Sequence, residues 1–271
     1  MHLRAARHMI HELLQRNPQT LDMDYRSCTG LALETYCFLT MVANITRYGL
    51  IPARTILFDT FTLSLNHLKA YDTHDIFFAF GHALFEHIPR IALLARQRLR
   101  EEEAGESACN SESELAYAKL LKRIEGWTIP GPNPRILQWL AEYGAVGEIW
   151  RHAITIYLKA TQCGSCVNDA RILRELQGHV SIIVRLWTGL RPSPFCTTLM
   201  WPSLIAGSVM TDPDQRKGLT NALRLDEFSM IYIEQALKLP HLLWEDNDKR
   251  SFGPYGLYLM MEKHDIHLCV A

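Results

Sequence analysis

Apolar residues recur at helical spacing along most of this chain. Near its start, Leu3, Ile10 and Leu13 would form one stripe on a helix, with the charged residues mostly on the other faces. Pro18 is expected to end that helix, because the residue before a proline avoids the helical region. The pattern predicts an all-α protein, an irregular multi-helix bundle of eight to ten helices in one domain over 1–271.

Capping residues and prolines divide the remaining chain. Ser111 and Glu114 have the spacing of a capping box, Asp75 can cap the helix that follows it, and Pro89 should kink or divide that helix. Propensity leaves 51–71 ambiguous between helix and strand. The further helices are expected over 24–48, 76–100, 111–127, 135–161, 169–189, 195–210, from 213 onward and over 226–244.

Two connections stand out by composition. The segment 101–113 is acidic, small and polar, and is the best candidate for a mobile loop. The segment 127–134 is rich in proline and glycine, and we expect it to connect two helices without regular structure.

Composition narrows the class of protein. With 48% hydrophobic residues and a net charge of −1, the chain can bury a sizeable core and offers no global attraction to nucleic acid. No stretch of about 18 uncharged apolar residues occurs, so a membrane span is not expected. Neither a secretory signal nor a glycine-rich phosphate loop is found.

The cysteines and histidines do not predict a metal site. Seven widely spread cysteines suit free thiols in a reducing compartment. Cys163 and Cys166 form a lone CxxC, without the second pair or the spaced histidines that zinc requires. We therefore expect two incidental loop cysteines, no bound metal and no cofactor.

Four short blocks carry a resemblance to a known family. Residues 2–6 (HLRAA) are similar to an HLRGA block, and residues 201–207 (WPSLIAG) to the end of an LLWPLFIAG block. Residues 80–86 (FGHALFE) and 150–158 (WRHAITIYL) match two further helical passages. The chain thus resembles the regulatory region of fungal transcription factors, a helical domain downstream of a zinc-cluster DNA-binding module.

The resemblance implies a regulatory or effector domain in transcriptional control, with a nuclear location and a role in a metabolic pathway such as secondary metabolism. The closely spaced cysteines of the zinc cluster do not occur in this sequence, so we expect no direct sequence-specific DNA binding by this chain alone. We expect a protein partner or a homodimer. The family's helices upstream of the first block are also missing, which predicts an exposed apolar patch or a dimer that covers it.

The family's helical bundle also implies a cavity for a small apolar metabolite. Large side chains of the predicted helices are the candidates to line it, although aromatic residues at helical spacing are more often core. The candidates are Phe77, Phe80, Phe85, Trp150, His152, Tyr157, Trp187 and Trp201.

An enzyme is the alternative hypothesis. A helical pocket can be reused as a cofactor-independent cyclase or pericyclase, in which orientation, desolvation and one acid–base group supply the catalysis. Such a protein would be cytoplasmic. Its candidate acid–base residues would be His152, His82, Glu86 and Asp75.

Overall fold

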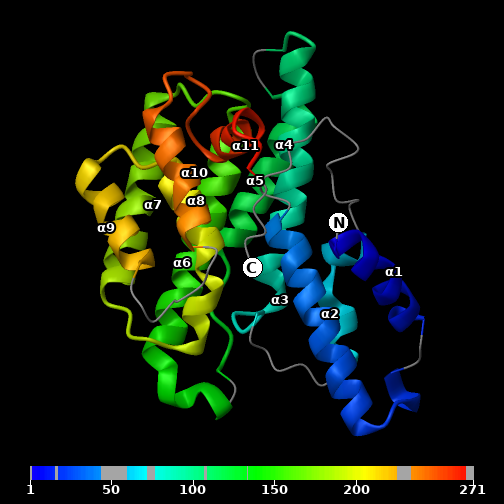
Figure 1. The fold of residues 1–271 in the computed structure, drawn as a ribbon. Helices are drawn as coiled ribbons and strands as arrows, with labels where there is room; N and C mark the ends of the chain where they lie inside the picture. The colour runs from blue at the N-terminus through cyan, green and yellow to red at the C-terminus, as the bar shows by residue number, and fades with distance from the viewer. Residues whose placement is uncertain are drawn as a thin grey trace.

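The described part of the chain is helical throughout. The computed structural model describes residues 2–15, 18–43, 60–71, 77–106, 109–132, 134–224 and 233–266. Over these residues it contains eleven α-helices and no strand (Figure 1). The predicted all-α class is confirmed, with one helix more than the expected range.

The α-helices and the shorter 3-10 helices follow one another without long irregular segments among the described residues. The α-helices are α1 (His2–Leu14), α2 (Met23–Ala43), α3 (His82–Phe85), α4 (His87–Glu103), α5 (Ser111–Glu125), α6 (Leu140–Gln162), α7 (Ala170–Thr188), α8 (Met200–Ser208), α9 (Pro213–Leu223), α10 (Ile233–Glu245) and α11 (Pro254–Lys263). The 3-10 helices are η1 (Pro18–Thr20), η3 (Thr60–Leu63), η4 (Leu65–Ala70), η5 (Pro134–Trp139) and η6 (Pro194–Thr198).

Helix α6 organises the bundle. It contacts α4, α5, α7 and α8, and it is buried along most of its length. In Figure 1, α7, α8, α9 and α10 group on the left, α4 and α5 run through the middle, and α1 and α2 form the right-hand edge. A helix that is apolar nearly all round is stable only when other helices surround it, which is the position α6 occupies.

Several helix ends follow from local chemistry. Asp169 caps α7 by accepting the Arg171 N–H at 2.7 Å, and Asp212 caps α9 with a proline at its first position. The predicted capping box of α5, which begins at Ser111, is wrong by one position. Asn110 is the cap, and its side-chain oxygen accepts the Ser113 N–H at 2.8 Å.

The predicted helix 76–100 divides at a different place from the one expected. The chain turns through 77–81, where Gly81 has φ = 89°, and the helix then breaks at Glu86 rather than at Pro89. Pro89 lies in the first turn of α4, where a missing N–H costs no intrahelical hydrogen bond. Asp75 and its predicted cap lie outside the described residues.

The expected loop 101–113 is shorter than predicted, because helices enter it from both sides. Glu101 in α4 is buried and accepts hydrogen bonds from Asn110 Nδ2 at 2.7 Å and from Ser113 Oγ at 2.9 Å. These bonds join the end of α4 to the start of α5 and leave 104–110 as the connection. Its mobility stays a prediction.

Two further outcomes concern the ends of predicted segments. The connection that begins at residue 127 ends at Pro134, where η5 begins. Helix α11 was not predicted, although its start is signalled by Gly253 followed by Pro254 at the first helical position.

Two glycines of α6 provide a test of how closely the bundle is packed. A Cβ on Gly147 would lie 2.8 Å from Ile129 Cδ1 and 3.1 Å from Phe80 Cδ1, whereas a Cβ on Gly144 would meet nothing within 4 Å. Gly147→Ala is therefore expected to lower the free energy of unfolding by about 1–2 kcal/mol through overpacking. Gly144→Ala should raise it by about 0.5–1 kcal/mol through helix propensity. Urea unfolding followed by circular dichroism measures both, and equal changes would contradict the packing described.

Candidate functional site

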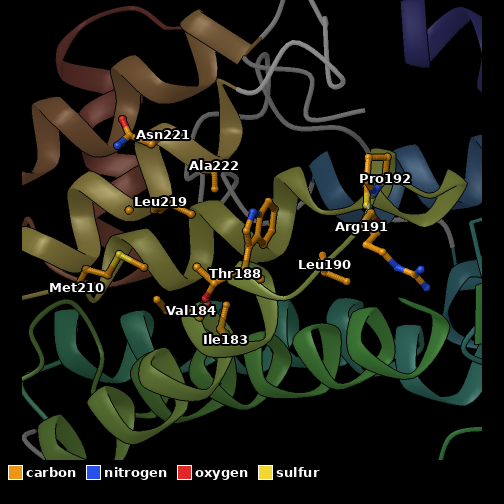
Figure 2. A pocket seen from close by; sticks show the side chains of 13 residues that line it. Ile183, Val184, Thr188, Leu190, Arg191, Pro192, Met210, Leu219, Asn221 and Ala222 are labelled. Carbon is orange, nitrogen blue, oxygen red and sulfur yellow. Dashed lines mark hydrogen bonds between the residues drawn. The ribbon is translucent and has the colours of Figure 1, made fainter. Parts of the chain in front are cut away.

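A cavity of about 370 Å³ lies between the C-terminal half of α7, the segment that follows it and α9 (Figure 2). We call it the apolar cavity. Its volume is in the lower part of the range for small-molecule sites. It is lined by Ile183, Val184, Trp187, Thr188, Leu190, Arg191, Pro192, Cys196, Met210, Gly218, Leu219, Asn221 and Ala222.

The sequence of α7 explains one wall. Its buried residues Leu176, Val180, Ile183 and Trp187 are spaced by four, three and four, which places them on one helical face. The last two reach the cavity, and Trp187 is 8% exposed there.

The opposite wall comes from α9 and the segment that enters it. Leu219 and Ala222 are three residues apart and share a helical face. Arg216 of the same helix donates from Nε and Nη2 to the Met210 carbonyl oxygen, at 3.0 and 2.7 Å. This contact fixes the chain segment that carries the Met210 side chain into the cavity wall.

The polar groups of the lining are largely engaged elsewhere. Figure 2 shows the Arg191 side chain extending away from the apolar side chains of α7 and α9. Its Nε donates to Glu142 Oε1 of α6 at 2.6 Å, and this hydrogen bond holds the pKa of Glu142 below its usual range. Thr188 donates its hydroxyl to the Val184 carbonyl oxygen at 2.6 Å. The interior therefore suits an uncharged apolar molecule.

A second cavity, of about 570 Å³, lies between η4, α3 and the connection that starts at Trp127. We call it the aromatic–polar cleft, because its lining includes both aromatic and ionisable side chains. Its lining residues are Asn66, Lys69, Phe78, Ala79, Phe80, Gly81, His82, Ala83, Glu86, Trp127, Thr128, Pro130, Gly131 and Ile136.

Most of the predicted pocket residues pack against one another instead of lining a cavity. Trp150 stacks on Trp201 with ring centroids 5.1 Å apart and contacts Phe85 at 4.8 Å, and Tyr157 meets Trp201 edge-on at 6.0 Å. Phe77 stacks on Phe38 at 4.8 Å. Among the predicted set, Trp187 lines the apolar cavity and Phe80 the aromatic–polar cleft.

His152 pairs with a residue that the sequence did not single out. Its Nδ1 lies 2.8 Å from Nδ1 of His179 on α7, so one neutral ring donates and the other accepts. Burial lowers the pKa of each histidine to about 4, and nearby Arg151 adds to the effect on both. The i,i+3 and i,i+4 pattern of α6 predicts an inward histidine, whereas the partner depends on how α7 crosses it.

This pair should make stability depend on pH. The unfolded chain takes up protons near pH 6.5, whereas the folded pair does so only near pH 4. The contribution of this pair to the free energy of unfolding is therefore largest above pH 6.5, and it is lost as the pH is lowered from 6.5 to 4. In the double variant His152→Gln, His179→Gln, the fall in Tm between pH 7 and 4.5 should be smaller than in the wild type.

The exposed His264 provides the control for that measurement. His264→Gln should leave the pH dependence of Tm as it is in the wild type. A double variant with the full wild-type slope would show that other groups cause the acid sensitivity.

The four candidate acid–base residues do not converge on one site. His82 and Glu86 are four residues apart and both line the aromatic–polar cleft. His152 lies at the contact between α6 and α7, where it is paired with His179. Asp75 lies outside the described residues.

Metal-ligating side chains are also dispersed. Within the described ranges, no group of three or more His, Cys, Asp or Glu residues could hold a metal ion. Cys163 and Cys166 are free thiols whose sulfurs donate to the Lys159 carbonyl oxygen and to Asn168 Oδ1. Burial raises the pKa of Cys163 to about 11, so its thiol is a poor nucleophile near neutral pH.

The helical fold and the matching sequence blocks define an all-α regulatory domain. A family model described as the fungal specific transcription factor domain matches residues 1–271, the whole chain. The chain belongs to this family, and membership supports a transcription-regulatory role. No curated protein and no solved structure matches it. No described helix is long and apolar enough to cross a bilayer.

Proposed function

We propose that this chain is the effector domain of a nuclear regulator of metabolic genes. It acts through protein partners, and a small apolar metabolite in the apolar cavity sets its activity. The observation that carries the proposal is the cavity between α7 and α9, whose arginine points away from its apolar walls. Cavities of this composition bind ligands by burying apolar surface.

Exposed apolar side chains on the first two helices support action through a partner. Met9 on α1 is 62% exposed, and Met23, Tyr25 and Leu31 on α2 are 76%, 40% and 38% exposed. Between Ser27 and the end of α2, the only charged residue is Glu34, which is buried. The central part of a protein–protein interface is likewise depleted in charged residues. These exposed apolar side chains are the observation that supports action through a partner.

The enzyme alternative has less support from the contacts in the aromatic–polar cleft. Glu86 accepts the Leu65 N–H at 2.7 Å through Oε1, and its Oε2 lies 3.5 Å from Arg90 Nη2. Among the candidate acid–base residues that the structure describes, His82 and Glu86 share this cleft, whereas His152 is paired with His179 between α6 and α7. We therefore propose binding rather than catalysis for this chain.

A fusion experiment tests the regulatory proposal. The 271-residue chain is joined to an unrelated DNA-binding module, and the output of a reporter gene carrying that module's site is measured. We expect the output to change at least several-fold relative to the DNA-binding module alone. A fusion that is present at normal level and leaves the output unchanged would contradict the proposal.

A further inference from the structure

The aromatic–polar cleft has walls that are fixed before any ligand enters. Tyr143 Oη lies 2.9 Å from the Ala79 carbonyl oxygen and 3.0 Å from that of Pro130, so one hydroxyl ties the two walls together. Gly81, at φ = 89°, brings the 78–81 turn so close to the other wall that an added Cβ would lie 3.4 Å from Pro130 Cγ. A preformed cleft loses little entropy when it binds a ligand.

Side chains of opposite charge line this cleft. Lys69 and Asn66 are three residues apart on η4, and side chains at that spacing eclipse one another on a 3-10 helix. Glu86 lines the same cleft from the end of α3, and its Oε2 also lies 3.5 Å from Nη2 of Arg90 on α4. In the part of the chain that the structure describes, Lys69 forms no ion pair with Glu86 or with any other carboxylate.

The hydrogen bond from the Leu65 N–H sets the position of Glu86 relative to η4. The Leu65 N–H donates to Oε1 at 2.7 Å, and a carboxylate oxygen can accept hydrogen bonds from more than one donor. The carboxylate is thus held beside the helix that carries Lys69. One of its oxygens accepts the Leu65 N–H and the other lies 3.5 Å from Arg90 Nη2, and each can accept a further donor such as an ammonium group.

Most of the remaining lining is apolar. Phe78 and Phe80 are buried residues of the lining. Trp127, Pro130 and Ile136 line the cleft from the connection and η5. His82 packs edge-on against Phe78 with centroids 5.6 Å apart. The cleft therefore combines a lysine, a glutamate that also contacts Arg90, and aromatic side chains.

We propose that the aromatic–polar cleft binds a free α-amino acid with an apolar side chain. The ligand carboxylate lies at the Lys69 ammonium and the Asn66 amide, and the ligand ammonium lies at the Glu86 carboxylate. The ligand side chain packs against Trp127 and the apolar wall. This site is separate from the apolar cavity, and its ligand does not depend on the function proposed for that cavity.

Calorimetric titration of the full chain tests the charge pattern with four probes. L-Phenylalanine and L-leucine are expected to bind. N-acetyl-L-phenylalanine lacks the ammonium charge and L-phenylalanine methyl ester lacks the carboxylate, so each should bind at least about tenfold more weakly than L-phenylalanine. Failure of both amino acids to bind at millimolar concentration, or equal binding of either derivative, would overturn the proposal.

A pair of lysine variants assigns the site. Lys69→Met should weaken L-phenylalanine binding at least about tenfold, whereas Lys119→Met, on an exposed lysine of α5, should leave it unchanged. Binding that survives Lys69→Met but is lost in Ala222→Trp would place the amino acid in the apolar cavity and overturn the assignment. Such a result would leave the proposed function of that cavity standing.

Discussion

Replacing Trp150 by alanine is expected to lower the free energy of unfolding by about 3–5 kcal/mol. The indole is fully buried, stacks on Trp201 and contacts Phe85, and its Nε1 donates to Thr198 Oγ1 at 3.2 Å. Its removal loses buried apolar area, ring contacts and one hydrogen bond at the place where α6, α8 and η6 meet. Total stabilities of domains are about 5–15 kcal/mol, so the variant should be at the margin of folding.

Urea unfolding followed by circular dichroism measures this effect, with Trp139→Ala as the control. Trp139 is only half-buried and precedes α6 without a side-chain capping hydrogen bond, so removing the same atoms there should cost clearly less. If the two variants lost equal stability, the stacked cluster of Trp150 and Trp201 would not be the centre of the core.

Ala222→Trp is expected to abolish most ligand binding in the apolar cavity. Ala222 lines the cavity from α9, and Figure 2 shows its side chain directed towards the α7 wall. An indole at this position would enter the cavity and reduce the space left for a ligand. The uncharged fluorescent probe N-phenyl-1-naphthylamine should bind the wild type and bind the variant at least about tenfold more weakly.

Ala118→Trp provides the matched control, because Ala118 is exposed on α5 and lines neither cavity. It should bind the probe as the wild type does, and both variants should keep the wild-type circular dichroism spectrum. Equal probe binding by all three proteins would place the probe, and the proposed metabolite, outside the apolar cavity.

The helices that the sequence predicts well are those with a local signal at their start. Asp169 and Asp212 satisfy free N–H groups of α7 and α9 within three residues, so tertiary contacts are not needed to place these ends. The division at Glu86 was misplaced because Pro89 is a strong breaker in a helix interior but harmless in a first turn.

The cavities could not be predicted in the same way. Hydrophobic periodicity shows which face of a helix turns inward, but not whether neighbouring helices leave a gap there. The predicted pocket residues are mostly large, and large aromatic rings such as Trp150 and Trp201 are those that fill space best. Smaller residues that leave the gap, such as Ala222, carry no signal of their own.

The reporter output of the fusion protein with and without Ala222→Trp tests the central claim most directly. The account predicts that Ala222→Trp changes the output at least several-fold at unchanged protein level, while Ala118→Trp behaves as the wild type. Identical output from all three fusions would show that the apolar cavity does not set the activity of this domain.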